Sequence, residues 1–209
     1  MSKTRQNIIQ KAIQLFNERG VINVRIRDIA KELEISPGNV SYHYKKKEDL
    51  LDSVYRFMIK RLEEMAVGNQ FMNPTKDPLY VAKGYLEHIS EFRFFYQDTL
   101  EIISSYPKLA ELHQQQVAQE KSIIRNLMFM SVGKGDLIAE PYQGVYESLA
   151  HSIWMTLHFW LTQQIIRGEK NNNLEEGLIT IANLLYPHAT EKGKAIFERI
   201  RGKLLAMTI

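Results

Sequence analysis

Apolar residues recur at helical spacing along almost the whole of this 209-residue chain, and no alternating pattern typical of a strand accompanies them. The first stripe extends from Ile8 to Phe16, and Gly20, a helix-stop residue, ends it. This spacing predicts an all-α protein of about nine or ten helices without an internal repeat. The longer helices are expected at about 47–65, 81–96, 108–130, 142–167, 174–185 and 195–206.

The stretch from residue 26 to residue 49 has the layout of a short helix, a tight turn and a second short helix, followed by a basic run. Ser36 is a good N-cap for the second helix, and Pro37 suits its first turn. Val40 and Tyr44 are expected to pack this helix onto the preceding two. A short helix with small and polar groups, backed by three lysines, fits the major groove of DNA.

Positive charge is concentrated in the same part of the chain. Residues 1–50 contain ten Lys or Arg and six Asp or Glu, so this part carries +4 and the rest −1 of a net charge of +3. Phosphate binding requires such a concentration of positive charge. The alternative is a merely solvated N-terminal face, for which the asymmetry would be a coincidence.

Composition narrows the class of protein. The chain has no cysteine, which excludes disulfides and thiolate chemistry, and its first residues lack the apolar run of a signal peptide. We therefore expect a cytoplasmic protein. The uncharged run from Ser148 to Ile166 is long enough to span a membrane, but its His and Gln residues are costly in a bilayer. A helix buried by protein is expected there, with no membrane partner.

Together these features resemble the TetR (tetracycline-repressor) family of bacterial regulators. The matching segments are IIQKAIQLFNERG at 8–20 and IRDIAKELEISPGNVSYHYKKKEDLL at 26–51. The resemblance implies an N-terminal three-helix, helix-turn-helix DNA-binding domain at 1–47 and a larger helical bundle at 48–209 for ligand binding and dimerisation. It also implies a homodimer that binds a near-palindromic double-stranded DNA operator and responds to a small-molecule effector.

The resemblance assigns roles to individual residues of the helix-turn-helix segment. Tyr42 falls on a groove-facing position, His43 on a position that contacts phosphate or base edges, and Lys47 on a phosphate-contacting lysine. Gly38 and Asn39 stand at the start of the recognition helix, where the backbone can approach a phosphate. The full set of expected DNA contacts is Arg25, Arg27, Ser36, Pro37, Gly38, Asn39, Ser41, Tyr42, His43 and Lys47.

Three residues depart from the family pattern. Ser41 stands where the family usually has tyrosine, so one contact is expected to be lost or shortened. Glu34 replaces a frequent glycine of the turn, which must then tolerate a side chain. Arg25 stands where the family often has a threonine or serine N-cap, and the cap is expected to weaken by ~1 kcal/mol.

Aromatic and methionine residues farther along the chain are candidates for an apolar ligand pocket. The segment FRFFYQDTLEIISSYPKLAELH at 92–113, with the later 154–160 segment, resembles a TetR subgroup with an uncharacterised repressor C-terminal domain. The alternative for each residue is an ordinary place in the hydrophobic core. The candidates are Met58, Phe92, Phe95, Tyr96, Met128, His151 and Trp154.

The stretch from Ile153 to Leu161 is apolar nearly all round its helix and must be covered on more than one side. An identical chain is a natural second cover, since obligate homodimer interfaces resemble a domain core cut in half. A central helix within one large bundle is the alternative. The residues expected at a dimer interface are Phe159, Trp160, Gln164, Ile181 and Leu185.

The chain lacks the Gly-x-Ser-x-Gly, His-Glu-x-x-His and phosphate-loop motifs of common enzyme classes. The short GKGD at 133–136 is expected to be a turn between helices, and His151 and His158 are spaced too far apart for a metal pair. We therefore expect no enzyme, cofactor or metal.

The expected function is a ligand-responsive transcriptional repressor that a small apolar or amphipathic effector releases from DNA. The effector would shift the long helix that begins near Lys47 and so change the spacing of two recognition helices. Two alternatives remain open. One is a DNA-binding protein without a small-molecule effector that acts through a protein partner, and the other is an all-helical enzyme that carries the N-terminal unit incidentally.

Overall fold

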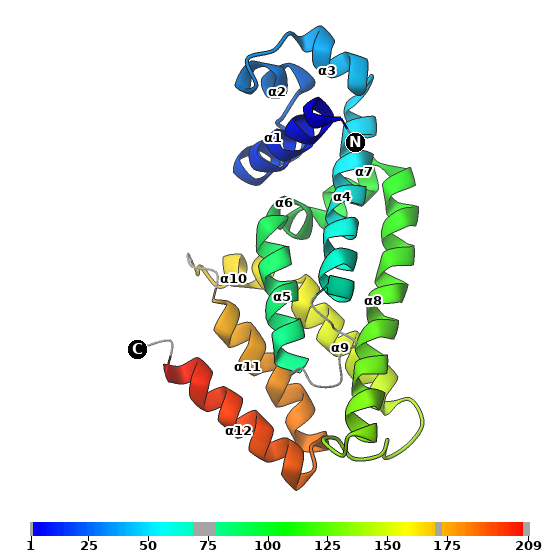
Figure 1. The fold of residues 1–209 in the computed structure, drawn as a ribbon, viewed down its shortest axis with the longest axis vertical. Coiled ribbons are helices and arrows are strands. Elements are labelled where there is room, and N and C mark those ends of the chain that lie inside the picture. Colours follow the sequence, from blue (N-terminus) through cyan, green and yellow to red (C-terminus); the bar gives the residue numbers. More distant parts are fainter. Residues whose placement is uncertain (1, 69–77, 170–172, 207–209) are drawn as a thin grey trace. The chain divides into compact units, whose positions relative to one another are not determined.

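Helices account for the regular structure of this protein. The computed structural model describes residues 2–68, 78–169 and 173–206, and these ranges contain twelve α-helices, one 3₁₀ helix and no strand (Figure 1). The predicted all-α fold is confirmed, with more helices than expected. The elements are α1 (Lys3–Arg19), α2 (Ile26–Glu32), α3 (Pro37–His43), α4 (Lys47–Gly68), α5 (Pro78–Glu91), α6 (Arg93–Gln97), α7 (Thr99–Ser105), α8 (Pro107–Gly133), α9 (Val145–His158), α10 (Trp160–Ile166), α11 (Leu174–Leu185), the 3₁₀ helix (Tyr186–His188) and α12 (Glu191–Ala206).

Two helices that were expected to be continuous are each divided in two. The segment 81–96 breaks at Phe92, between α5 and α6, and the segment 142–167 breaks at Phe159, between α9 and α10. Neither break contains proline or glycine, so the apolar spacing runs through it without a stop signal. Most of the loop expected between Gly68 and Pro78 lies outside the described residues.

The helices form two compact units. The first contains residues 1–65 and 91–114, and the second contains residues 66–90 and 115–209. The predicted helix-turn-helix domain at 1–47 lies within the first unit, but α6, α7 and the start of α8 belong to this unit as well.

The helix-turn-helix part of the first unit has its own core. Val40 and Tyr44, on the inner face of α3, are at most 1% exposed. The apolar stripe of α1 is buried from Ile8 to Phe16, as its spacing predicted. The helices α2 and α3 pack against each other, and α1 packs against α2 (Figure 1). Each of these helices therefore has one face fixed by packing.

A second set of contacts in this unit ties α1 to the junction between α5 and α6. The Asn17 side chain donates to the Glu91 carbonyl at 2.8 Å and accepts from the Phe94 N–H at 3.0 Å. The Arg93 guanidinium donates to the Asn17 carbonyl at 3.3 Å. The rings of Phe16 and Phe94 pack with their centroids 5.4 Å apart. These contacts explain why α6 shares a compact unit with α1.

Aromatic rings fill another part of the first unit. The Phe95 ring lies 5.1 Å from the Tyr55 ring and 5.0 Å from the His113 ring, measured between centroids. Burial lowers the pKa of His113 to about 4, so its imidazole is neutral at pH 7. Because the pKa is lowered in the folded state, the stability associated with neutral His113 is present above pH ~6.5 and is lost as the pH falls toward 4.

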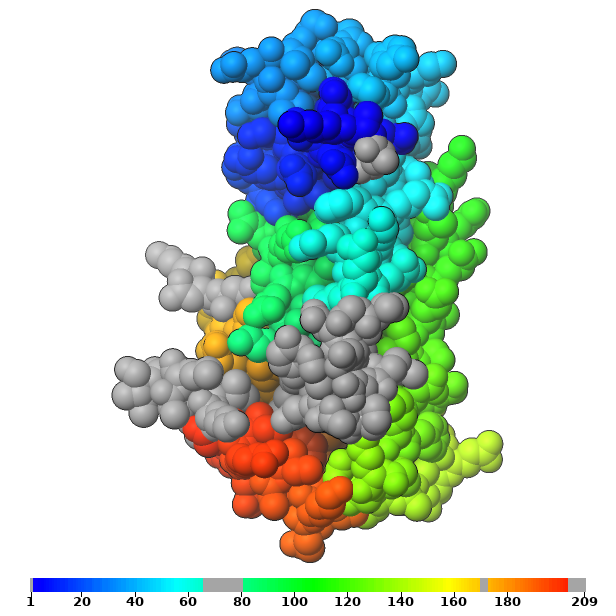
Figure 2. Space-filling model, in the orientation of Figure 1, coloured from blue at the N-terminus to red at the C-terminus, as the bar shows by residue number. Residues whose placement is uncertain are grey.

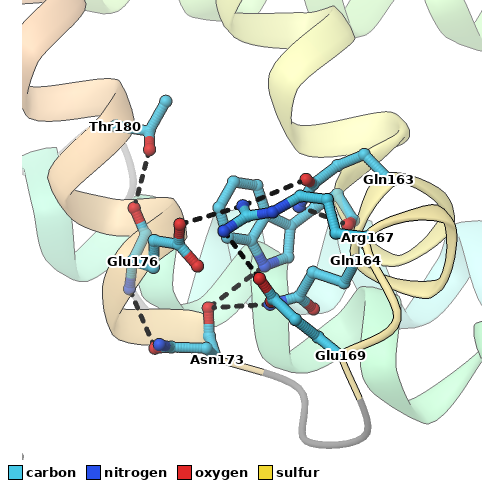
Figure 3. A network of polar contacts seen from close by, with 8 residues as sticks. Gln163, Gln164, Arg167, Glu169, Asn173, Glu176 and Thr180 are labelled. Carbon is cyan, nitrogen blue, oxygen red and sulfur yellow. Dashed lines mark hydrogen bonds and ion pairs between the residues drawn. The ribbon is translucent and has the colours of Figure 1, made fainter.

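Trp160 is buried within the second unit. Its side chain is 4% exposed and packs on Gly177 of α11, where an added Cβ would lie 3.0 Å from the indole. The indole N–H donates to the Asn173 carbonyl at 3.1 Å, and the Gln164 amide reaches the same carbonyl at 3.5 Å (Figure 3). These contacts join α10 to the start of α11.

Arg167 forms the exposed side of the same junction. Its guanidinium donates to Gln163 Oε1 at 3.3 Å and forms ion pairs with Glu169 and Glu176 at 2.6 and 3.0 Å (Figure 3). The Asn173 side chain accepts from the Glu176 N–H at 3.0 Å and so caps α11. Because the ion pairs are partly exposed, each contributes little to stability, and the buried indole remains the main contact.

The burial of three of the expected interface residues bears on the predicted dimer interface. Trp160, Gln164 and Ile181 are 3–4% exposed and pack inside one chain. Since one chain already buries these three side chains, they offer a second copy little surface, and their place at an interface stays a prediction. Phe159 is 46% exposed and Leu185 is half-buried, so their place at an interface stays a prediction.

No helix within the described ranges has the length and apolar character needed to cross a membrane. The uncharged run at 148–166 forms most of α9 and α10, whose buried side chains include Ile153, Leu157 and Leu161. The turn predicted at 133–136 is confirmed, since α8 ends at Gly133 and Gly135 has a left-handed φ of 73°.

Candidate nucleic-acid interface

The outer face of α3 presents most of the residues that were expected to contact DNA. The Ser36 hydroxyl accepts from the Asn39 N–H at 3.2 Å and caps the helix, and Pro37 occupies the first turn. His43, at the end of the helix, is half-buried. The exposed residues are Ser36, Pro37, Gly38, Asn39, Ser41 and Tyr42.

Positive side chains flank this face in the sequence. Arg25 and Arg27 are exposed at the start of α2, and Lys45 and Lys46 are exposed after the end of α3. Figure 2 shows the side chains of α2 and α3 gathered into a continuous surface, in the lighter blues of its colour bar. Long basic side chains around a groove-sized helix are positioned to contact phosphates.

Tyr42 is 84% exposed, although it is an aromatic residue on a short helix. Its ring lies edge-on to the His43 imidazole, with 5.2 Å between the centroids. The side chain therefore contributes little to the packing of α3. Its ring and hydroxyl are available to a partner outside the chain, as the predicted groove-facing position requires.

The fold would accept a residue other than glycine at position 38. A Cβ built on this residue would meet only Ser36 Oγ, at 3.8 Å, which is an ordinary contact distance. The residue also lies in the helix with no left-handed φ. Since neither sterics nor backbone conformation requires glycine here, its missing side chain favours a close approach of another molecule to the start of α3.

The N-terminus of α2 has no side-chain cap, and an aspartate in its first turn accepts a backbone hydrogen bond there instead. Arg25 occupies the N-cap position, and its side chain has no hydrogen-bond acceptor with which to cap the helix. The Arg25 backbone N–H instead donates to the Asp28 carboxylate at 2.8 Å. Arg27 lies 4.0 Å from the same carboxylate, and its side chain is 67% exposed. Both guanidinium groups remain in reach of an external phosphate.

Lys47 has a structural contact that its predicted role did not include. Its ammonium group donates to the carbonyls of Val21 and Ile22, the latter at 3.2 Å. Burial lowers the pKa of Lys47, and the nearby Asp28 carboxylate opposes this change. Because an ammonium has three N–H donors, one remains for a phosphate. The DNA contact of Lys47 stays a prediction.

Arg5 supports α3 and was missed by the sequence analysis. Its guanidinium donates to the Tyr44 hydroxyl at 3.0 Å and to Ser53 Oγ at 3.3 Å. It also lies over the Tyr44 ring, 5.1 Å from the centroid. These contacts hold the end of α3 against α1 and α4. Sequence spacing alone carries no signal for a contact between residues 39 positions apart.

The candidate ligand-binding residues divide between the two units. Met58, Phe92, Phe95 and Tyr96 belong to the first unit, where each is at most 3% exposed. The other candidates lie in the second unit, where Met128 is buried, Trp154 is half-buried and His151 is exposed. The His151 and Trp154 rings stack with centroids 6.0 Å apart. A ligand role for any of these residues stays a prediction.

Two family models match the chain and together account for most of it. Residues 8–54 match the model described as bacterial regulatory proteins, tetR family, and residues 69–197 match a model described as bacterial transcriptional repressor, TetR. The chain belongs to the TetR family. The first match includes every residue of the surface formed by α2 and α3.

Curated relatives of this TetR-family chain are transcriptional regulators. AcrR of Shigella flexneri is 32% identical over 89 residues, which are 43% of this chain and 41% of AcrR. YerO of Bacillus subtilis strain 168 is 27% identical over 186 residues, which are 84% of this chain and 61% of YerO. The chain thus spans less than two thirds of the length of each of these relatives.

Solved structures show the same TetR fold. A TetR-family regulator from Marinobacter aquaeolei VT8 matches with a TM-score of 0.84 at 20% identity, covering 97% of this chain and 99% of that chain. A regulator from Saccharomonospora viridis in complex with choline matches with a TM-score of 0.75 at 19% identity, covering 91% and 100%. At these identities the likeness establishes the fold.

Glu34 is the departure from the TetR pattern with the clearest structural cost. It has φ of 55°, the left-handed conformation, and no other non-glycine residue in the described ranges has a positive φ. Its N–H still donates to the Lys31 carbonyl at 3.1 Å, so the turn is formed despite the side chain. The expectation that this turn must tolerate a side chain is confirmed.

Replacement of Glu34 by glycine is expected to raise the free energy of unfolding by about 1 kcal/mol, because glycine adopts this φ without a Cβ clash. Urea unfolding at one fixed protein concentration measures the change. Glu34→Ala is the control, since it removes the carboxylate but keeps the Cβ, and should give no comparable gain. Equal stabilisation by both substitutions would assign the effect to charge and contradict the strain.

Proposed function

We propose that this protein is a transcriptional repressor that binds a near-palindromic DNA operator as a homodimer and is released by a small-molecule effector. The observation that carries the proposal is α3, a capped helix with exposed polar groups on one face and buried Val40 and Tyr44 on the other. The proposed activity takes place in the cytoplasm, where the operator would lie.

The direction of α3 follows from its packing. Burial of Val40 and Tyr44 fixes the rotation of the helix, which leaves Ser41 and Tyr42 outward. The N-terminal end carries Gly38 and Asn39, which can approach the sugar-phosphate backbone closely. In this arrangement the phosphate contacts position the helix, and Asn39 and Tyr42 read base edges.

Homodimerisation is supported by exposed apolar residues in the second unit. Met155 on α9, Phe159 at the break after it and Ile166 at the end of α10 are 41%, 46% and 79% exposed. Met155 and Phe159 are four residues apart across the end of α9, which places these two side chains on one side of that helix. A second copy of the chain would cover them and would supply the second recognition helix for the operator.

Effector control is supported by the family and by one structural neighbour, the Saccharomonospora viridis regulator in complex with choline. The first unit contains two candidate routes for the signal. One is α4, which begins at Lys47, and the other is the contact of Asn17 with the α5–α6 junction. The alternative, a DNA-binding protein that responds to a protein partner, would use the same routes without a small molecule.

The proposed function is tested by selecting binding sites from random DNA with the full-length protein. An enriched inverted repeat is expected, with half-site centres ~34–36 Å apart for one helical turn of DNA. Two chains should bind each site in analytical ultracentrifugation. No enriched sequence at low salt would overturn the proposal. Enrichment of a single half-site bound by one chain would refute the dimer.

Two lysines give a matched test of phosphate contacts. Lys45→Met is expected to weaken binding to all sequences and to lower the slope of log K against log salt by ~1, without loss of stability, since Lys45 is exposed. Lys47→Met should lower the slope similarly and also destabilise the fold, because the Val21 and Ile22 carbonyls lose a donor. An unchanged slope in Lys47→Met would restrict Lys47 to its structural role.

A further inference from the structure

The second unit contains one buried carboxylate among the side chains that the structure describes. Glu120, on α8, is 7% exposed. Its Oε2 accepts from the Tyr85 hydroxyl at 2.8 Å and from the Trp154 indole N–H at 3.1 Å, and its Oε1 accepts from the Gln116 amide at 3.1 Å. Three helices, α5, α8 and α9, thus direct neutral donors onto one carboxylate.

The carboxylate has hydrogen bonds but no opposite charge. None of the ion pairs found in the described part of the chain includes Glu120. Burial raises the pKa of Glu120, and the three hydrogen bonds oppose this change. A buried carboxylate is costly without a cationic partner. The chain retains this cost although a glutamine of nearly the same shape would avoid it.

The arrangement leaves room for one further donor. An ionised carboxylate has about four lone-pair sites, and Tyr85, Trp154 and Gln116 take three of them. The remaining site is on Oε1, which has a single donor. The side chains of Tyr85 and Trp154 are only half-buried, whereas Glu120 behind them is buried. The negative charge therefore lies beneath aromatic rings that reach the surface.

We propose that Glu120 is the counter-charge for an organic cation with a primary or secondary ammonium group, whose N–H donates to Oε1 while its apolar part lies on Tyr85 and Trp154. This inference rests on the proposed effector control and names the chemical class of the effector. The Tyr85 ring beside the carboxylate favours such a cation through cation–π attraction, and the carboxylate favours it through charge. The ligand supplies the positive charge that the chain does not.

A metal ion is a poorer fit for this position. The described residues contain no group of three side chains that suits a metal ion. Imidazoles also contact the rings that bond Glu120: His88 lies against the Tyr85 ring, and the Trp154 indole stacks with both His151 and His158. One carboxylate with neutral donors and aromatic rings suits an organic ammonium ion.

The test compares pairs of primary amines and the corresponding alcohols, both alkyl and arylmethyl, by titration calorimetry on the full-length protein. The amine of at least one pair should bind ten-fold or more tightly than its alcohol at pH 8. Glu120→Gln should abolish this preference and keep operator binding in the absence of ligand. Glu111→Gln, at an exposed position of the same helix, should leave the preference intact. Glu120→Asp, which retains the charge, should weaken the preference without abolishing it.

The pH dependence of amine binding tests the role of the Glu120 carboxylate. Because a proton and the cation compete for Glu120, amine affinity should rise with pH through the raised pKa and level off above it. Any dependence that persists in Glu120→Gln belongs to groups other than this carboxylate, including the amine itself. The inference is overturned if no amine binds, if alcohols bind equally well, or if Glu120→Gln retains the preference. Operator binding by the wild-type protein is measured separately. If the protein binds its operator but no amine, only the inference about Glu120 fails, and if it binds no operator, the proposed function fails.

Discussion

Replacement of Trp160 by alanine is expected to lower the free energy of unfolding by about 3–5 kcal/mol. The indole is 4% exposed, packs on Gly177 and donates to the Asn173 carbonyl at 3.1 Å. The substitution would leave a cavity at the α10–α11 junction and would remove a donor from a partly buried carbonyl. Gly177 has no side chain to move into the space, so the backbone of α11 would line the cavity.

Urea unfolding at a fixed protein concentration measures this loss, with light scattering on the same samples to follow the oligomeric state. Phe159→Ala is the matched control, since Phe159 is adjacent in sequence but 46% exposed. It should destabilise one chain by much less and act mainly on association. If Trp160→Ala dissociated the dimer while the chain kept its stability, Trp160 would belong to the interface after all.

Replacement of Tyr42 by alanine is expected to lower operator affinity by about 10- to 100-fold, or about 1–3 kcal/mol. The side chain is 84% exposed on the outer face of α3 and contacts only the neighbouring His43 ring among the aromatic groups described. Its loss should therefore remove contacts with DNA and leave the packing of Val40 and Tyr44 unchanged. The melting temperature is expected to stay within error of the wild type.

Fluorescence anisotropy with a labelled operator, taken from the random-sequence selection, measures this effect. Tyr142→Ala provides the control, because Tyr142 is 73% exposed in the second unit and lies outside α2 and α3. Its operator affinity should equal that of the wild type. Equal affinity for Tyr42→Ala and wild type would remove Tyr42 from the contacts and would leave Asn39 and Ser41 as the residues that read bases.

The helix-turn-helix segment was predictable because its signals are local. Ser36 and Pro37 mark the start of α3, and the helical period alone places Val40 and Tyr44 on the inner face. The helix breaks at Phe92 and Phe159 were not predictable in this way, since no proline or glycine marks them. Local chemistry thus determined the helix-turn-helix segment better than the helices that follow it, in both units.

The sequence did not predict where individual side chains of the candidate sites point. A lysine has a long flexible chain, so the position of Lys47 did not reveal that its ammonium group lies on the carbonyls of Val21 and Ile22. Glu120 lies in a polar stretch, HQQQVAQEK, which is typical of a solvated helix face. Its burial depends on Tyr85 and Trp154, which are 35 and 34 residues away. Such contacts depend on tertiary packing.

The contact of Asn17 bears on how regulators of this kind can be recombined. A chimera joined at residue 47 would import a foreign α1 but keep the native α6, and the Glu91 carbonyl and Phe94 N–H would both lose the Asn17 side chain. A graft that carries residues 1–65 together with 91–98 would preserve these bonds. The part of the chain that should be exchanged as a whole therefore consists of two separate sequence segments. A single junction in the gene cannot transfer both of them.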